Sequence, residues 1–138
     1  MPEIIEKPIR VAVVEDNLDN ADLICSLIEL DFGPHKVRHW VAGEVFLSEW
    51  NSDQPPTLVL LDLQLPQLDG YAVLNRLRQL PGGAGTKVIA VSANVLGTDL
   101  DAAQAAGFDG FLGKPLKIQR FSEQIRRILN GEFVWEPH

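Results

Sequence analysis

The sequence predicts an α/β protein built on a doubly wound, five-stranded parallel sheet with helices on both faces. Three observations indicate this fold class. Two apolar runs, at residues 9–14 and 57–61, have the length of a strand and no polar alternation, which is typical of strands buried on both faces of a parallel sheet. Helical patterns follow these runs. Strand and helix patterns then alternate five times, and right-handed crossovers place helices on both faces.

The expected strands are short apolar segments bounded by turn-forming residues. They comprise residues 9–14, 35–41, 57–62, 87–91 and 108–112. The second segment is the least hydrophobic, which suits an edge of the sheet. We expect the order 2-1-3-4-5, in which the first and third strands lie side by side and the fourth lies next to the third.

The expected helices are marked by apolar residues three and four positions apart. They comprise residues 18–30, 43–50, 71–80, 99–106 and a last segment with its buried face over 121–129. Asn17 is a good N-cap for the first helix, and Gly33-Pro34 breaks it. Pro81 ends the third helix and Gly107 closes the fourth.

Length and composition predict one domain, residues 1–138, with a core over about 8–130 and a tail over 131–138. Cys25 is the single cysteine and cannot form an internal disulfide, so we expect a cytoplasmic protein. No apolar stretch is long enough for membrane insertion. The net charge of −7 argues against non-specific binding to nucleic acid.

Polar residues stand where the expected strands end. Glu15 and Asp16 follow the first strand, Asp62 ends the third, Ser92 follows the fourth, and Lys114 follows the fifth. Ligands of open α/β sheets bind beyond the carboxyl ends of the strands, so these side chains are expected to meet there. A single aspartate at a strand end could equally cap a loop. Asp62, however, is accompanied by polar residues at the neighbouring strand ends.

This cluster predicts a site for a divalent cation and for phosphoryl transfer. Three carboxylates repel each other unless a cation neutralises them, and hard oxygen ligands suit Mg²⁺ or Mn²⁺. Zinc is not expected, because the histidines belong to an edge strand (His35 and His39) and to the tail (His138). A carboxylate beside a metal ion, a lysine and a hydroxyl suits transfer of a phosphoryl group onto aspartate.

These residues resemble the receiver domain of bacterial two-component response regulators. The resemblance covers about residues 8–130 and rests on Glu15-Asp16, Asp62 in DLQLPQLDG, Ser92 in VSAN, and Lys114-Pro115. It implies a flavodoxin-like fold and a stand-alone phosphoacceptor protein of a phosphorelay rather than an enzyme. No DNA-binding domain follows Asn130, so output is expected to pass through protein contacts or phosphate relay.

The resemblance also implies a role for each matched residue. Asp62 would accept a phosphoryl group from a histidine kinase or a histidine phosphotransfer protein, with Lys114 and Ser92 acting at that group. Asp16 and Asp62 look like direct metal ligands, Gln64 a ligand through its backbone carbonyl, and Glu15 a ligand through water. Ser92 and Phe111 would form the conformational switch.

The sequence departs from the family pattern at four positions. Glu15 stands where aspartate is commoner, Ser92 replaces threonine, Phe111 lacks a tyrosine hydroxyl, and Leu65 occupies a position often held by methionine. Two alternative functions differ from this one in the residues they require. A haloacid-dehalogenase-like phosphotransferase or phosphatase would carry its nucleophile in a DxD motif on the first strand, and a phosphorylation-independent scaffold would not need every reacting group.

The last helices and the tail suggest an interface. Acids at 99, 101 and 109 and bases at 117, 120, 126 and 127 give the face of the fourth helix, fifth strand and fifth helix both signs of charge, which would suit a homodimer. Solvated charge is the alternative. The apolar run 133–135 should either fold back on the domain or be buried in a partner.

Overall fold

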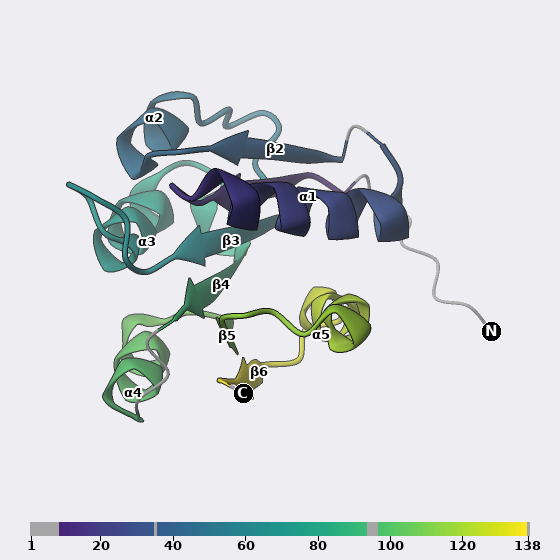
Figure 1. Cartoon of the computed structure of the whole chain (residues 1–138). Coiled ribbons are helices and arrows are strands. Elements are labelled where there is room, and N and C mark those ends of the chain that lie inside the picture. Colours follow the sequence, from purple (N-terminus) through teal and green to yellow (C-terminus); the bar gives the residue numbers. More distant parts are fainter. Residues whose placement is uncertain (1–8, 35, 94–96, 138) are drawn as a thin grey trace.

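Strands and helices alternate along the described chain (Figure 1). The computed structural model describes residues 9–34, 36–93 and 97–137. Its strands are β1 (Val11–Val14), β2 (Val37–Trp40), β3 (Leu58–Asp62), β4 (Lys87–Ser92), β5 (Gly110–Gly113) and β6 (Val134–Glu136). Its helices are α1 (Leu18–Phe32), α2 (Gly43–Ser48), α3 (Gly70–Gln79), the 3₁₀ turn η1 (Gly83–Gly85), α4 (Gly97–Ala106) and α5 (Ile118–Leu129). None of these helices could cross a membrane.

The described sheet is parallel throughout and has the order β2-β1-β3-β4-β5-β6. The predicted fold class and the order of the first five strands are confirmed. The predicted number of strands differs, because the tail adds β6 beside β5. Of the histidines expected outside the site, His35 and His138 lie outside the described residues.

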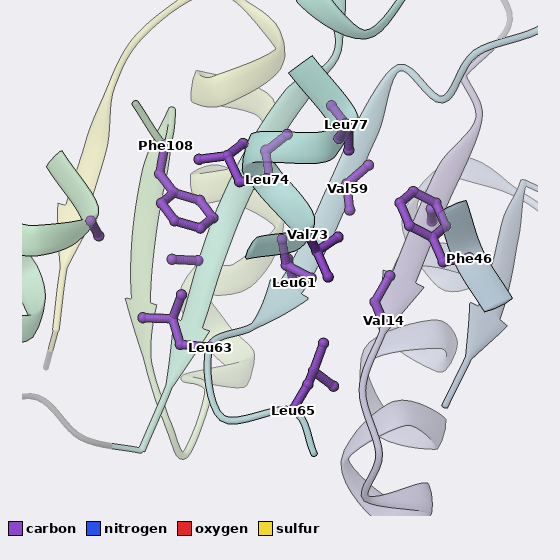
Figure 2. Packing of buried hydrophobic residues seen from close by; sticks show 14 of the residues in the cluster. Val14, Phe46, Val59, Leu61, Leu63, Leu65, Val73, Leu74, Leu77 and Phe108 are labelled. Carbon is purple, nitrogen blue, oxygen red and sulfur yellow. The ribbon is translucent and has the colours of Figure 1, made fainter. Parts of the chain in front are cut away.

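The two faces of the sheet carry separate apolar clusters. Alternate residues of a strand point to opposite faces, so Val14 and Leu61 pack toward α2 and α3, whereas Val13 and Leu60 pack toward α1 and α5. Figure 2 shows the first cluster, in which Phe46 lies against the central strands. Full burial of one such leucine or valine contributes about 1.5–3 kcal/mol. The central strands therefore hold the carboxyl ends of β1 and β3 in place.

Local signals place the first turns of two helices beside those strand ends. The Asn17 side chain accepts a hydrogen bond from the Asn20 amide at 2.9 Å and caps α1. Asp69 caps α3 in the same way through the Ala72 amide at 2.9 Å. A Cβ at Gly70 would lie 2.6 Å from the backbone oxygen of Asp62, so only glycine lets α3 begin this close to β3.

The tail folds back on its own domain, which is one of the two outcomes predicted for it. Val134 is 1% exposed and joins the cluster on the α5 side of the sheet, and Trp135 packs on the opposite face. The tail also brings acids to α5, because Glu136 forms ion pairs with Arg120 and Arg127. Sequence periodicity could not place a strand of three residues.

Several charges that suggested a homodimer are paired within the chain. Asp109 binds Arg78 at 3.0 Å and accepts a hydrogen bond from the Val88 amide at 2.8 Å. Arg126 binds Asp31 of α1 at 3.3 Å. The face of α4, β5 and α5 is therefore partly neutralised, and its β5 edge is covered by β6.

Candidate functional site

Three carboxylates meet at the carboxyl ends of β1 and β3. Glu15 and Asp16 follow β1, Asp62 ends β3, and their ligand oxygens all lie within 4.8 Å of one another. The Glu15 and Asp62 residues are 1% and 4% exposed, whereas Asp16 is exposed. The predicted cluster of acids is therefore present, with one member open to solvent.

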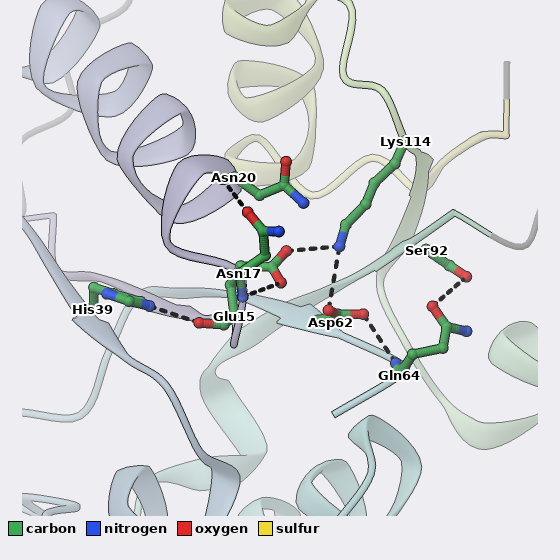
Figure 3. A network of polar contacts seen from close by, with 8 residues as sticks. All are labelled: Glu15, Asn17, Asn20, His39, Asp62, Gln64, Ser92 and Lys114. Carbon is green, nitrogen blue, oxygen red and sulfur yellow. Dashed lines mark hydrogen bonds and ion pairs between the residues drawn. The ribbon is translucent and has the colours of Figure 1, made fainter. Parts of the chain in front are cut away.

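Lys114 supplies a positive charge between the two buried acids (Figure 3). Its Nζ lies 2.7 Å from Glu15 Oε1 and 3.2 Å from Asp62 Oδ2. The lysine follows β5 and precedes a cis peptide bond to Pro115. One ammonium thus contacts two of the three carboxylates, and the cluster keeps an excess of negative charge.

The protonation of this cluster reflects burial and crowding. Burial raises the pKa of Glu15 to about 7, helped by its hydrogen bond with Asp62 and opposed by Lys114. Burial by itself lowers the pKa of Lys114, but its contacts with Glu15 and Asp62 outweigh this and raise the pKa above the ordinary value. The lysine therefore remains an ammonium ion at neutral pH.

A second set of contacts positions the opposite oxygen of Asp62. The Gln64 amide donates to Asp62 Oδ1 at 2.9 Å, so both carboxylate oxygens are held, one by a backbone amide and one by Lys114. The Ser92 hydroxyl donates to the Gln64 side-chain oxygen at 3.1 Å. Figure 3 shows this chain of contacts from β3 to the end of β4. Asp62 is therefore oriented before any ligand arrives.

Phe111, the other half of the predicted switch, lies apart from this polar network. It is fully buried in β5 and belongs to the apolar cluster on the α3 and α4 side of the sheet. Leu65, in the loop that follows β3, is 6% exposed and belongs to the same cluster. The structure thus places Ser92 at the site and Phe111 behind it.

Sequence reasoning missed three contributors to the site. The His39 ring nitrogen Nε2 lies 2.7 Å from the Glu15 backbone oxygen, although His39 was expected to be a simple edge residue. The Gln64 side chain, rather than only its backbone, contacts Ser92. Gly70 admits α3 beside Asp62. Only the role of Gly70 could have been recognised in the sequence, because this glycine directly follows an N-cap aspartate, Asp69, at the expected start of a helix.

The donor set fits magnesium. Mg²⁺ prefers oxygen ligands, keeps several waters and is usually bound by one or two carboxylates. The described carboxylates offer such oxygens, and the exposed Asp16 leaves a side open to water. His39 contacts a backbone oxygen and is not in the group of potential metal ligands, which does not favour zinc.

A cavity of about 320 Å³ opens beside Lys114, between α1 and the segment after β5. It is lined by Asn20, Leu23, Ile24, Val91, Ala93, Lys114, Pro115 and Leu116. Leu23, which lines the cavity from α1, is 38% exposed. The site therefore has an apolar rim on the α1 side, and exposed apolar surface of this kind is typical of interaction sites.

The geometry agrees with comparison to known proteins. The family model for the response regulator receiver domain matches residues 11–126. The chain belongs to this family, whose members are the phosphoacceptor signalling modules of two-component systems. This membership supports the receiver interpretation over the dehalogenase alternative.

Individual relatives differ in length. The chain is 35% identical to the two-component response regulator ORR41 of rice over 83% of this chain and 89% of that protein. It is 33% identical to the peroxide stress-activated histidine kinase mak1 of Schizosaccharomyces pombe over 87% of this chain but only 8% of the kinase. The chain thus corresponds to a small part of some relatives and to most of others.

A solved structure shows the same fold with a metal ion. The receiver domain of the sensor histidine kinase PA1611 from Pseudomonas aeruginosa, which has a magnesium ion in its active-site cleft, is 26% identical. The match covers 90% of this chain and 99% of that domain, with a TM-score of 0.77. A magnesium ion is therefore bound in the cleft of a receiver domain with this fold.

Proposed function

We propose that Asp62 accepts a phosphoryl group from a phosphohistidine of a histidine kinase or histidine phosphotransfer protein, in a reaction that requires Mg²⁺ or Mn²⁺. The observation that carries this proposal is the position of the Asp62 carboxylate, buried at the end of β3 with both oxygens held. An oxygen of Asp62 attacks phosphorus, the P–N bond to imidazole breaks, and its electron pair stays on the ring nitrogen. A carboxylate nucleophile needs no general base.

The acids beside Asp62 would hold the metal ion. We assign direct ligation to Asp16, Asp62 and the backbone carbonyl of Gln64, and ligation through water to Glu15. The meeting of the three acids at the carboxyl ends of β1 and β3 supports this assignment. When bound, the ion would neutralise charge on the transferred oxygens. Glu15 then keeps its second role, which is to hold Lys114 at 2.7 Å beside Asp62.

Lys114 and Ser92 would stabilise the transferred group from two sides. Lys114 already contacts Asp62 Oδ2, so its ammonium lies close to where a phosphoryl oxygen arrives. Ser92 currently donates to Gln64, and a phosphoryl oxygen is a stronger acceptor for that hydroxyl. Movement of the Ser92 hydroxyl toward the phosphoryl group would change the packing around β4 and then the packing of Phe111. We propose that this change is the conformational switch.

The apolar rim supports docking of a protein donor. Leu23 of α1 lines the cavity beside Lys114 and is 38% exposed, and a phosphohistidine must approach Asp62 from outside. We place the chain in the cytoplasm, where the free Cys25 stays reduced. A homodimer through α4, β5 and α5 is a subordinate proposal, since it requires β6 to leave the β5 edge.

Phosphorylation by a small donor tests the proposal. The protein with acetyl phosphate and Mg²⁺ should gain one phosphoryl group by intact mass, and Asp62→Asn should gain none. Asp69→Asn, an acid on the same loop that caps α3, is the matched control and should still be modified. The assignment of Asp62 is wrong if Asp62→Asn gains the same acid-labile adduct at the same rate.

The same samples test the switch. Ser92→Ala should still be phosphorylated, but the amide NMR shifts of residues 97–112 should respond less than in the unaltered protein. Equal shift changes in both proteins would remove Ser92 from the switch and leave the assignment of Asp62 intact.

A further inference from the structure

We propose that the outer edge of β5, together with two arginines of α5, is a binding site for an extended peptide segment with apolar, aromatic and acidic residues in succession. Residues 132–136 of this chain, which we call the strap, occupy the site in the structure. A partner protein that carries a segment of the same chemistry would bind there when the strap leaves. This inference does not depend on phosphorylation of Asp62.

The backbone of β5 is shaped to accept a neighbouring strand. The strap pairs with it in parallel, with Gly110 opposite Val134, Phe111 opposite Trp135, and Leu112 opposite Glu136. A Cβ at Gly110 would lie 3.0 Å from the Val134 backbone oxygen and 2.9 Å from Ile128 Cδ1. Any side chain larger than hydrogen at this position would crowd both the strap and α5. The absence of a side chain at Gly110 thus lets the strap backbone lie close to β5.

The two faces of the strap select different apolar residues. Val134 points to the α5 side, where it is buried in the cluster that contains Ile125 and Ile128. Trp135 points to the other face and packs on the cluster that contains Phe111. Phe133 stacks on Trp135 with ring centroids 6.0 Å apart, yet remains 63% exposed. The site therefore takes a small aliphatic residue followed by a large aromatic one.

Glu136, the last residue of the strap, is recognised by charge. Its carboxylate lies 2.5 Å from Arg120 and 3.0 Å from Arg127, and it accepts a hydrogen bond from the side-chain amide of Gln124 at 2.9 Å. Gln124 is only 4% exposed, so its polar side chain is buried against the strap. Glu132 adds a contact of 3.3 Å to Arg127. Three polar groups of α5 thus converge on one carboxylate.

The strap can separate from the domain without unfolding it. β6 has three residues and one neighbouring strand, and its arginine partners are 44% and 35% exposed. Exposed ion pairs contribute little, and peripheral segments open well before the core does. A tethered segment nevertheless acts at an effective concentration in the mM range, so it excludes a weaker external segment. Access to the site is therefore controlled by how firmly the strap is held.

The experiment adds the segment from outside. A fluorescent peptide with the sequence of residues 131–137 is titrated into three full-length proteins, and binding is followed by anisotropy. These are the unaltered protein, a strap-weakened double variant (Val134→Ser with Glu136→Gln), and Glu123→Gln. The last neutralises an α5 acid that lies at 4.0 Å from Arg127 and outside the strap. A peptide with glutamine in place of its last glutamate tests charge recognition.

We expect the double variant to bind the peptide at least tenfold more tightly than the unaltered protein and Glu123→Gln do. The glutamine peptide should bind the double variant several-fold more weakly. Equal binding to all three proteins, or no binding to a folded double variant, would overturn the proposal.

Hydrogen exchange of the unaltered protein gives a second, independent test. The amides of residues 134–136 should exchange at least tenfold faster than those of β4, because the strap opens on its own. If they exchange only as fast as β4, the strap leaves only on global unfolding and the site is not available to a partner. This measurement decides whether the strap opens on its own even if the double variant does not fold.

Discussion

Two charged clusters in this domain are built on opposite principles. The site cluster consists of Glu15, Asp16, Asp62 and Lys114, and the strap cluster consists of Arg120, Arg127, Glu132 and Glu136. In the first, three acids face one base, and two of the acids are almost completely buried. In the second, two acids face two bases that are partly exposed.

The difference in net charge distinguishes a site that favours binding of a cation from a cluster whose acids and bases neutralise each other. Buried carboxylates without enough positive charge are unfavourable, as the pKa of about 7 for Glu15 indicates, so a cation gains free energy by binding there. The strap cluster is already neutral and gains nothing from an added ion. An excess of one sign of charge among buried side chains is thus a better indicator of a functional site than the number of charged residues.

The largest effect is expected from removing the base of the site cluster. Lys114→Met leaves Glu15 and Asp62 buried without their partner, so the free energy of unfolding at neutral pH should fall by about 3–5 kcal/mol. Urea denaturation measures this, and added Mg²⁺ should recover part of the loss. Lys117→Met, which alters an exposed lysine with no ion pair among the described residues, is the matched control. Similar losses in both variants would show that the site cluster does not depend on Lys114.

A change of opposite sign is expected from removing one acid of the same cluster. Asp16→Asn relieves repulsion, so the metal-free protein should be as stable as the unaltered one or slightly more stable. Stabilisation by Mg²⁺ should disappear, and so should phosphorylation by acetyl phosphate. Thermal melts with and without Mg²⁺ measure the first effect, with Asp19→Asn of α1 as control. A loss of about 3 kcal/mol without metal would instead indicate a structural pair.

The smallest effect is expected from the strap cluster. Glu136→Gln removes a carboxylate from two partly exposed arginines but keeps an acceptor for Gln124, so stability should fall by less than half the loss in Lys114→Met. Urea denaturation of both variants in one buffer gives the comparison, and Glu123→Gln should change almost nothing. If Glu136→Gln destabilises as much as Lys114→Met, the strap is part of the core, and the contrast between the clusters is lost.

Much of the fold and the site was predictable because it depends on local pattern and on a general rule of topology. Apolar runs at 9–14 and 57–61 predict central strands, and a capping residue such as Asn17 predicts where a helix begins. Parallel strands end at one edge, so the acids after β1 and β3 had to approach each other. The contacts of His39 and of the Gln64 side chain were not predictable, because they depend on rotamers and strand register.

The sequence by itself determined the parallel sheet and the meeting of Glu15, Asp16, Asp62, Ser92 and Lys114, since hydrophobic period and strand-end position suffice for these. The order of the first five strands followed from the general topology of such sheets. The tertiary structure alone decided the place of the tail. The run 133–135 is too short to show a period, and its apolar residues would be satisfied equally by a partner or by its own domain. Its strap pairs with β5 because Gly110 leaves room for a backbone there, and because α5 turns Arg120 and Arg127 toward the same edge. Both conditions join residues that are distant in sequence, and only the folded chain brings them together.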